Sequence, residues 1–276
     1  MQGFGSSVRS RGRAVAAAVA VLALLLTSPA AVVAGRSRAS SIIGYDISYP
    51  QCGKAFPDDA AFQIVGVNGG LVFSPNPCLG AGDDPSELTW AGGSNAQLYA
   101  NTGNPGPALS THWPTGQTFP LPCNTTWSTG PDTANCAYDY GWNAAADSYR
   151  TAVQAFISLG FAAPDAARTP FPMMWWLDVE ITNSWRDDVT LNIAVLEGEV
   201  AYLKSMSPAG IGFYSNQYQW NEITGGTRVF ARYPSWVAGA TTFGQAAINC
   251  GVKAFNGGRV LMAQFFSKGF DADLSC

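Results

Sequence analysis

Two carboxylates, one residue apart, end an apolar stretch near the middle of the sequence. The stretch is residues 171–180, FPMMWWLDVE, and its acids are Asp178 and Glu180. Side chains of a β-strand alternate between its two faces, at a rise of about 3.3 Å per residue, so two acids at this spacing would share a face. The pair suits acid-assisted hydrolysis. The alternative is a strand that simply turns polar where it meets solvent.

The apolar run also indicates the element that carries the pair. A parallel strand buried on both faces reads as a continuous apolar run, and catalytic side chains of α/β barrels lie at the C-terminal ends of such strands. Two further acids stand at predicted strand ends: Asp46 ends an early strand, and Asp271 comes just after the last one. We therefore expect four acids to converge at one mouth of a barrel.

Hydrophobic periodicity predicts an alternation of strands and helices along the chain. Besides the run that ends in the acid pair, short apolar runs predict strands at 41–46, 62–67, 95–101, 210–215, 235–238 and 260–266, and helical spacing predicts helices at 142–159 and 188–206. This order favours the α/β class and a single-domain, TIM-like irregular (β/α) barrel. Residues 103–136 are rich in Pro, Gly, Thr and Asn and are expected to form a long loop at the rim of the site.

The first 34 residues have the composition of a secretory signal. Three arginines precede the apolar stretch 14–26, and a series of small residues ends at Ala34. The apolar stretch has 13 residues, short of the roughly 20 needed to span a bilayer, so no stable membrane anchor is expected. We expect a signal peptide over 1–34, a barrel domain over 35–276, and a secreted, extracellular protein.

The charge of the expected mature chain argues against nucleic acid as a partner. Removal of the three arginines leaves 12 of the 15 Lys and Arg residues against all 19 Asp and Glu residues, a net charge near −7. Nucleic acid and anionic membrane surfaces bind basic patches, and the sequence contains none.

Six cysteines fall in the expected mature chain, and an even number in an exported protein indicates three disulfides. Fifteen pairings are possible. Proximity in sequence would join Cys52 to Cys78, Cys123 to Cys136, and Cys250 to Cys276.

A metal site is not expected, because the sequence has no Cys-x-x-Cys and one histidine, His112. This histidine lies in the long loop, where it is expected to be a solvated surface residue, and carboxylates remain the plausible catalysts. No cofactor is expected, because phosphate-binding and dinucleotide-binding fingerprints are absent.

Six short motifs, in order along the chain, carry a family resemblance. They are residues 44–48 (GYDIS), 176–180 (WLDVE), 213–215 (FYS) with Trp220, 233–238 (YPSWVA), 263–265 (AQF) and 270–273 (FDAD). In this order they resemble the family 25 glycoside hydrolases, the muramidase-type lysozymes, over nearly the whole expected mature chain. The resemblance implies an irregular β/α barrel and cleavage of the β-1,4 bond after N-acetylmuramic acid in bacterial cell walls.

The resemblance also implies roles for the four acids. Glu180 matches the general acid, and Asp178 matches the partner that stabilises the charged intermediate formed with help from the substrate's acetamido group. Asp46 and Asp271 match the flanking acids of the pocket. A carboxyl group crowded by other carboxylates has a raised pKa and can donate a proton near neutrality.

Four other residues are candidates for binding the sugar. Tyr214 and Trp236 stand near strand ends close to the acids and could stack on sugar rings, while Asn216 and Gln264 could hydrogen-bond hydroxyl groups. A core or loop-capping role is the alternative for each. The expected partner is a cell-wall polysaccharide, and the chain itself is expected to be monomeric.

The chain also departs from typical members of the family. It carries 67–70 (VNGG) where they have a charged segment, and it adds the disulfides and the 103–136 insertion. These departures are typical of a divergent secreted branch. Two alternatives follow: a catalytically silent carbohydrate-binding protein on the same scaffold, or a hydrolase of another N-acetylated glycan such as a chitin-like polymer.

Overall fold

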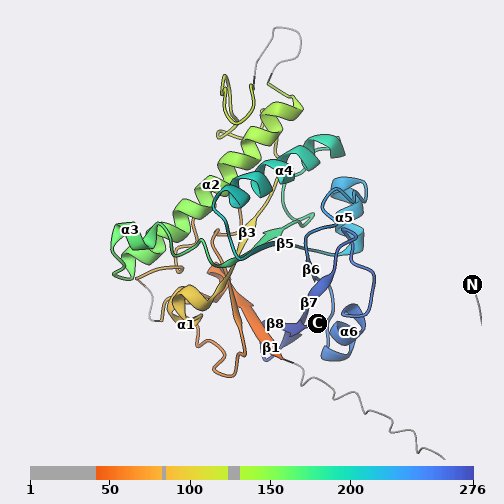
Figure 1. Ribbon diagram of the computed structural model, residues 1–276. Helices are drawn as coiled ribbons and strands as arrows, with labels where there is room; N and C mark the ends of the chain where they lie inside the picture. The colour runs from red at the N-terminus through yellow and green to blue at the C-terminus, as the bar shows by residue number, and fades with distance from the viewer. Residues whose placement is uncertain (1–41, 83–84, 124–130) are drawn as a thin grey trace, which may run out of the picture. The chain divides into compact units, whose positions relative to one another are not determined.

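A closed barrel of eight strands forms the centre of the fold (Figure 1). The computed structural model describes residues 42–82, 85–123 and 131–276. The expected signal peptide lies outside these residues. Strands β1 to β7 follow one another around the barrel as parallel neighbours, and β8 closes it by pairing antiparallel with both β7 and β1. The predicted α/β class and TIM-like barrel are confirmed.

The strands lie close to the predicted runs. Their bounds are β1 (Ile43–Ile47), β2 (Gln63–Gly66), β3 (Gln97–Asn101), β4 (Met174–Asp178), β5 (Gly210–Ser215), β6 (Ser235–Val237), β7 (Val260–Ser267) and β8 (Phe270–Ser275). The eighth strand was not predicted, and it changes the position of Asp271, which lies inside β8 instead of after the last strand.

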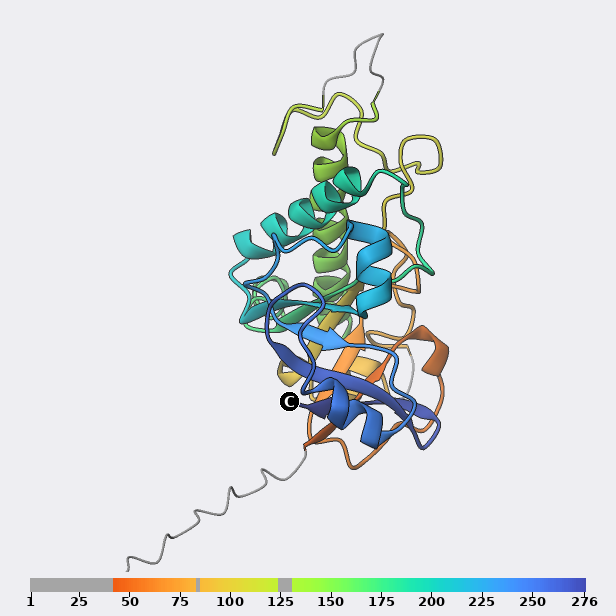
Figure 2. The same ribbon diagram turned by 90° about the vertical axis from the view of Figure 1, so that its right-hand side faces the viewer.

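A tight turn explains how β8 forms. Lys268 and Gly269, between β7 and β8, have φ angles of 54° and 85°. Two central residues with positive φ are typical of a type I′ hairpin turn, whose twist matches that of the flanking strands. Because β8 runs antiparallel, its first residues lie where the parallel strands end. In Figure 2 the dark blue of β7 and β8 lies beside the orange of β1.

Helices surround the described barrel and vary greatly in length. Their bounds are α1 (Glu87–Trp90), α2 (Ala134–Ser158), α3 (Ala163–Ala166), α4 (Val189–Ser205), α5 (Gln217–Thr224) and α6 (Phe243–Asn249), with 3₁₀ turns at Tyr49–Gln51 and Gly93–Asn95. Helix α2 begins eight residues before the predicted start, because Thr133 caps it by accepting a hydrogen bond from the Cys136 amide. Asp188 caps α4 in the same way, by accepting a hydrogen bond from the Thr190 amide.

Strand β4 shows how the fold aims the acid pair. Trp175, Leu177 and Val179 pack in the large apolar cluster that includes residues of α2 and α4. Trp176 packs on the other face of the strand, in a cluster with Ile64, Trp236 and Met262 from other strands. Alternation puts Asp178 on the same face as Trp176, and therefore toward the inside of the barrel at its mouth.

Three disulfides pin segments outside the barrel. They join Cys52 to Cys78, Cys123 to Cys136, and Cys250 to Cys276, with Cα atoms 5.7, 4.6 and 5.2 Å apart. This is the pairing of sequence neighbours. Cys136 belongs to α2, so the disulfide at Cys123 ties the long loop to that helix. In the part of the chain that the structure describes, no helix combines the length and apolar character needed to cross a membrane.

Candidate active site

All four predicted acids line one cavity at the mouth of the barrel. The cavity has a volume of about 310 Å³, and Asp46, Asp178, Glu180 and Asp271 share its lining with Tyr99, Asn101 and residues of the loops that follow β1, β2 and β4. The acids come from three strands that are distant in sequence: β1, β4 with the residues just after it, and β8. The described residues of the long loop 103–136 contribute nothing to this lining.

The two acids of the central pair have different surroundings. Asp178 is 5% exposed, and Asn101 at the end of β3 donates a hydrogen bond from Nδ2 to its Oδ2 at 2.7 Å. Glu180 is less buried, and Gln219 donates to its Oε1 from Nε2 at 3.3 Å. The Gln219 amide is itself held in place, because its Oε1 accepts a hydrogen bond from the Ile181 amide at 2.7 Å.

A second group of acids faces this pair from β1 and β8. Asp46 and Asp271 are directly opposite each other in the antiparallel ladder. Asp273, two residues further along β8, is fully buried, and its carboxyl group lies close to that of Asp46. Trp236 donates its indole N–H to Oδ1 of Asp273 at 2.7 Å. The β1 and β8 side of the pocket therefore brings three carboxyl groups close together.

Burial and mutual repulsion keep protons in this cluster. Burial, followed by the charge of Asp271, raises the pKa of Asp46 to about 8. Burial and then the neighbouring Glu180 raise the pKa of Asp178 well above its ordinary value, while the hydrogen bond from Asn101 acts in the opposite direction. Burial raises the pKa of Glu180 as well, and Asp271 adds to this effect. The pocket can therefore supply a proton at pH values where an exposed carboxyl group is ionised.

The four predicted sugar-binding residues do not line the acid pocket. Tyr214 donates its hydroxyl to Oε1 of Gln264 at 2.7 Å, and Gln264 Nε2 donates to Oδ2 of Asp46 at 3.0 Å. These two residues contact the site through Asp46. Trp236 is 2% exposed and offers no free face for stacking, because β6 points its side chain into the barrel. Asn216 caps α5 through the Gln219 amide and lines a separate cavity.

Several site residues were missed at the level of sequence. Tyr99 and Asn101 lie on β3 and line the acid pocket. The predicted strand ended at Asn101, and a polar residue at the end of a strand could have marked it as a candidate. Asp273 repeats the spacing of the central pair, since it follows Asp271 by two residues. Gln219 could not be recognised as a site residue from the sequence, because its position depends on how α5 packs beside the mouth of the barrel.

The arrangement has the parts that glycoside chemistry needs. A partly exposed carboxyl with a raised pKa can protonate a departing glycosidic oxygen, and a neighbouring carboxylate can stabilise the positive charge that develops on the sugar. In the residues that the structure describes, no cluster of His, Cys, Asp and Glu has the arrangement of a metal site.

Comparisons of sequence point in the same direction. Residues 167–250 match the family model described as "Lysozyme-like protein 1", a span that includes Asp178 and Glu180. A stretch of 65 residues, 24% of the chain, is 38% identical to a probable GH family 25 lysozyme 4 of Dictyostelium discoideum. The match spans 30% of the length of that relative.

Comparisons of structure extend over most of the chain. The muramidase of Trichobolus zukalii has a TM-score of 0.50 at 18% identity, and the match covers 85% of this chain and 93% of that one. A family GH25 lysozyme of Aspergillus fumigatus has a TM-score of 0.51 at 14% identity, with coverages of 86% and 94%. At these identities the structures show a shared fold. With the sequence matches, they confirm the predicted resemblance to the family 25 lysozyme-like superfamily.

Proposed function

We propose that this relative of the family 25 lysozymes is a secreted glycoside hydrolase of the muramidase type, which cleaves the N-acetylated glycan of bacterial cell walls. One observation carries the proposal: Asp46, the pair Asp178 and Glu180, and Asp271 come from three segments far apart in sequence and line a single cavity at the mouth of the barrel. A structural role for these acids would not require their convergence, since unpaired buried carboxylates are costly and are retained mainly where chemistry uses them.

Glu180 is the proposed general acid. Its side chain is less buried than that of Asp178, so a glycosidic oxygen in the cavity can reach it. Its pKa is raised by burial and by the charge of Asp271, which favours the protonated form that the first step requires. Gln219 holds one oxygen, Oε1, and leaves the other for the substrate.

Asp178 is the proposed stabiliser of the intermediate. In a substrate-assisted reaction the acetamido group of the sugar attacks the anomeric carbon, and a carboxylate beside it balances the positive charge of the ring that forms. The Asn101 amide fixes Oδ2 of Asp178 at 2.7 Å and favours its ionised form. Oδ1 of Asp178 is buried and has no donor among the described residues, so the hydrogen bond from Asn101 is the contact that orients this carboxylate.

Asp46 and Asp271 are the proposed flanking acids, and each of them makes the potential of the cavity more negative when it is ionised. A negative cavity favours an oxocarbenium-like transition state over the neutral ground state, because charge appears only as the bond breaks. The side-chain amide of Gln264 donates to Oδ2 of Asp46 and fixes the position of this carboxyl group on the inner wall.

The substrate and location belong to the same proposal. Two similar proteins are named as a muramidase and a lysozyme, which supports cell-wall peptidoglycan as the polysaccharide partner. The signal-like composition of residues 1–34 and the three disulfides support export and an oxidising environment. The proposal assigns the chemistry to one chain acting as a monomer.

Substitution of the proposed acid tests the assignment. The mature protein and its Glu180→Gln variant are incubated with purified cell walls, and new reducing ends and loss of turbidity are measured. We expect the variant to lose at least about a hundredfold in rate, because an amide cannot donate a proton to the leaving oxygen. Glu222→Gln, a change of the same type at an exposed position on α5, serves as the control and should leave the rate unchanged. Equal rates for wild type and Glu180→Gln would refute the assigned acid.

A further inference from the structure

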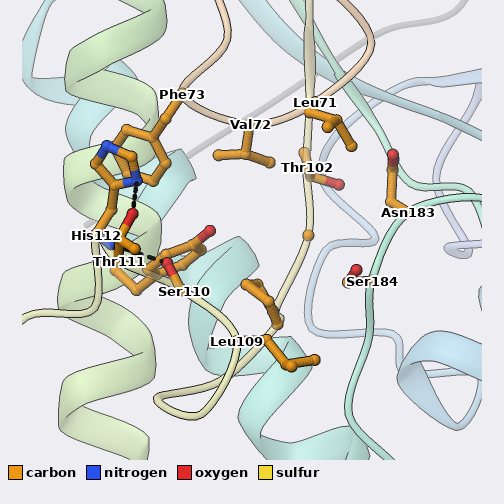
Figure 3. A pocket seen from close by; sticks show the side chains of 13 residues that line it. Leu71, Val72, Phe73, Thr102, Leu109, Ser110, Thr111, His112, Asn183 and Ser184 are labelled. Atoms are coloured by element: carbon orange, nitrogen blue, oxygen red, sulfur yellow. Dashed lines mark hydrogen bonds between the residues drawn. The ribbon is translucent and has the colours of Figure 1, made fainter.

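A second cavity adjoins the acid pocket and has no part in the chemistry proposed above (Figure 3). Its volume is about 210 Å³, and its walls are residues 71–73, residues 109–112 of the long loop, and the pair Asn183 and Ser184. Figure 3 shows these three segments facing one another, with His112 beside Phe73 on one side and Asn183 and Ser184 on the other.

The two cavities are neighbours, because the same chain segments line both. Gly70 lines the acid pocket and the next residue, Leu71, lines the second cavity. At the end of β3, Asn101 lines the acid pocket and the next residue, Thr102, lines the second cavity. Asn183 lines both cavities. A chain-like ligand that fills the acid pocket can therefore continue into the second cavity.

The walls of the second cavity are held in place. Phe73 has a φ of 61°, which is an outlier for a bulky residue and persists only when its surroundings enforce it. Its ring stacks on His112 with centroids 4.2 Å apart and meets Tyr140 of α2 edge-on at 5.5 Å. Next to His112, Trp113 stacks on Tyr140 at 5.1 Å and donates to the Pro131 carbonyl at 2.9 Å. A preformed cavity of this kind loses little entropy when a ligand binds.

The lining indicates the chemistry of the ligand. Aliphatic and aromatic side chains share the walls with hydroxyl and amide groups, and no Asp, Glu, Lys or Arg is among the lining residues that the structure describes. An N-acetylated sugar combines apolar ring faces and a methyl group with hydroxyl and amide groups. The volume is below the roughly 300 Å³ at which pockets for drug-sized ligands begin, so it suits one ring better than several.

We propose that this cavity is a subsite for one uncharged N-acetylated sugar unit of the same glycan, adjacent to the units held at the acids. The inference rests on the proposed function, from which it takes the glycan. A peptide substituent of the glycan is the less favoured occupant, because its carboxylates would need a cation. Arg186, which lies close to Gly106 of the same loop, is already bound to Asp132 by two hydrogen bonds of 2.9 and 2.6 Å.

Ligand length and a pair of wall substitutions test the subsite together. Binding is measured by calorimetry on the disulfide-bonded Glu180→Gln protein, with peptide-free glycan oligomers of graded length prepared from cell walls. We expect affinity to rise when the oligomer becomes long enough to reach the second cavity. Leu71→Ala combined with Leu109→Ala should remove that rise, a loss of about tenfold for long oligomers, and leave the affinity for short oligomers unchanged.

A matched control keeps this result specific. Leu71 and Leu109 are 61% and 78% exposed, and Ile248 on α6 is 69% exposed but lies outside the cavity, so Ile248→Ala should behave as the parent protein. The subsite is refuted if no oligomer binds, if the wall substitutions weaken short and long oligomers equally or not at all, or if they affect only peptide-bearing fragments.

The same proteins without the Glu180 substitution separate the two proposals. The protein could cleave no glycan and still show length-dependent binding that the wall substitutions abolish. That result would refute the proposed enzyme and support the subsite. Cleavage with a Michaelis constant that the wall substitutions do not change would refute the subsite alone.

Discussion

Side-chain amides distinguish the two acids at the end of β4. Asn101 binds the buried Asp178, while Gln219 binds one oxygen of the more exposed Glu180. Hydrogen bonds to a carboxylate favour its ionised form, so the shorter bond at Asp178 opposes the effect of burial there. The two acids on one face of this strand therefore have different amide partners, and the amide of Asn101 holds the pKa of Asp178 below the value that burial and Glu180 alone would give it.

Removal of the Asn101 amide should therefore alter the pH dependence of catalysis. Asn101→Ala deletes the 2.7 Å hydrogen bond and raises the pKa of Asp178 further. We expect the acidic limb of the profile of kcat against pH to move upward by about one pH unit, and the maximal rate to fall about tenfold. Asn221→Ala, on the exposed side of α5, is the control. An unchanged acidic limb in Asn101→Ala would argue against a catalytic role for Asp178.

The residues show where sequence reasoning succeeded and where it stopped. The spacing of Asp178 and Glu180 predicted a shared face, and both line the cavity, because alternation along a strand is a local property. Trp236 was expected to stack on sugar, but it is buried and bonded to Asp273, since the direction of its side chain depends on where β6 sits in the barrel. Asp273 had the informative spacing from Asp271, but the run FDADLS is too polar to be recognised as a barrel strand.

At the scale of elements, strand β8 is the piece that completes the site. The parallel strands bring Asp46 and Asp178 to the mouth, but Asp271 reaches it because the Lys268–Gly269 turn reverses the chain. An antiparallel closing strand places its beginning, instead of its end, beside the C-terminal ends of the others. The antiparallel direction therefore places Asp271 in the cavity. In a parallel strand at the same place, the second residue would lie at the opposite end of the barrel.

Helices α2 and α4 make the closest contact outside the barrel, and glycine permits it. A Cβ atom at Gly198 of α4 would overlap the backbone carbonyl of Tyr138 on α2, and one at Gly141 of α2 would overlap the carbonyl of Val195 on α4. Glycine inside a helix costs roughly 0.5–1 kcal/mol relative to alanine, so these positions give up helix stability for close packing. Figure 1 shows the two helices crossing side by side.

Gly198→Ala should therefore destabilise the protein, although alanine is the better helix former. We expect the free energy of unfolding to fall by about 2 kcal/mol or more, because backbone atoms cannot move aside as a flexible side chain would. The measurement is denaturant unfolding followed by circular dichroism, with disulfides intact. Gly244→Ala on α6 is the matched control: a Cβ there meets nothing closer than 4.0 Å, and the change should be neutral or slightly stabilising. Equal effects at the two positions would contradict the close contact.

At the scale of the whole molecule, the acid cluster links folding to pH. The pKa of Asp46 is raised from an ordinary value of 3.8 to about 8. Between these values the native protein holds a proton that the unfolded chain releases. The free energy of unfolding must then decrease as pH rises through this window, by up to about 1.4 kcal/mol per pH unit for each proton held. The raised pKa values of Asp178 and Asp273 act in the same direction.

The stability of wild type should accordingly fall from pH 5 to pH 8. Asp46→Asn keeps the shape of the neutral side chain and cannot ionise, so its stability should vary less with pH and exceed that of wild type at pH 8. Chemical denaturation at several pH values measures both effects, and the exposed Asp58→Asn provides the control. Stability that stays level or increases over this range in wild type would show that the cluster does not retain its protons.

The general architecture was predictable from the sequence. Apolar runs and segments with helical spacing occur many times along the chain, and together they indicate an alternation of strands and helices. The predicted starts of β5, β6 and β7 agree with the structure. The second cavity could not be predicted from the sequence. It depends on the stacking of Phe73 on His112, which are 39 positions apart and belong to no periodic pattern or motif. His112 was expected to be solvated, and it is exposed but also packed on one face.

The identity of the sugar left at the cut end distinguishes a muramidase from any other hydrolase or binding protein. Purified peptidoglycan is digested with the mature protein, the new reducing ends are converted to alcohols with borohydride, and the reduced sugar is identified by mass spectrometry. We expect reduced N-acetylmuramic acid from the wild type and none from Glu180→Gln. Reduced N-acetylglucosamine, or no new reducing end from a protein that still binds the glycan, would contradict the proposed muramidase activity.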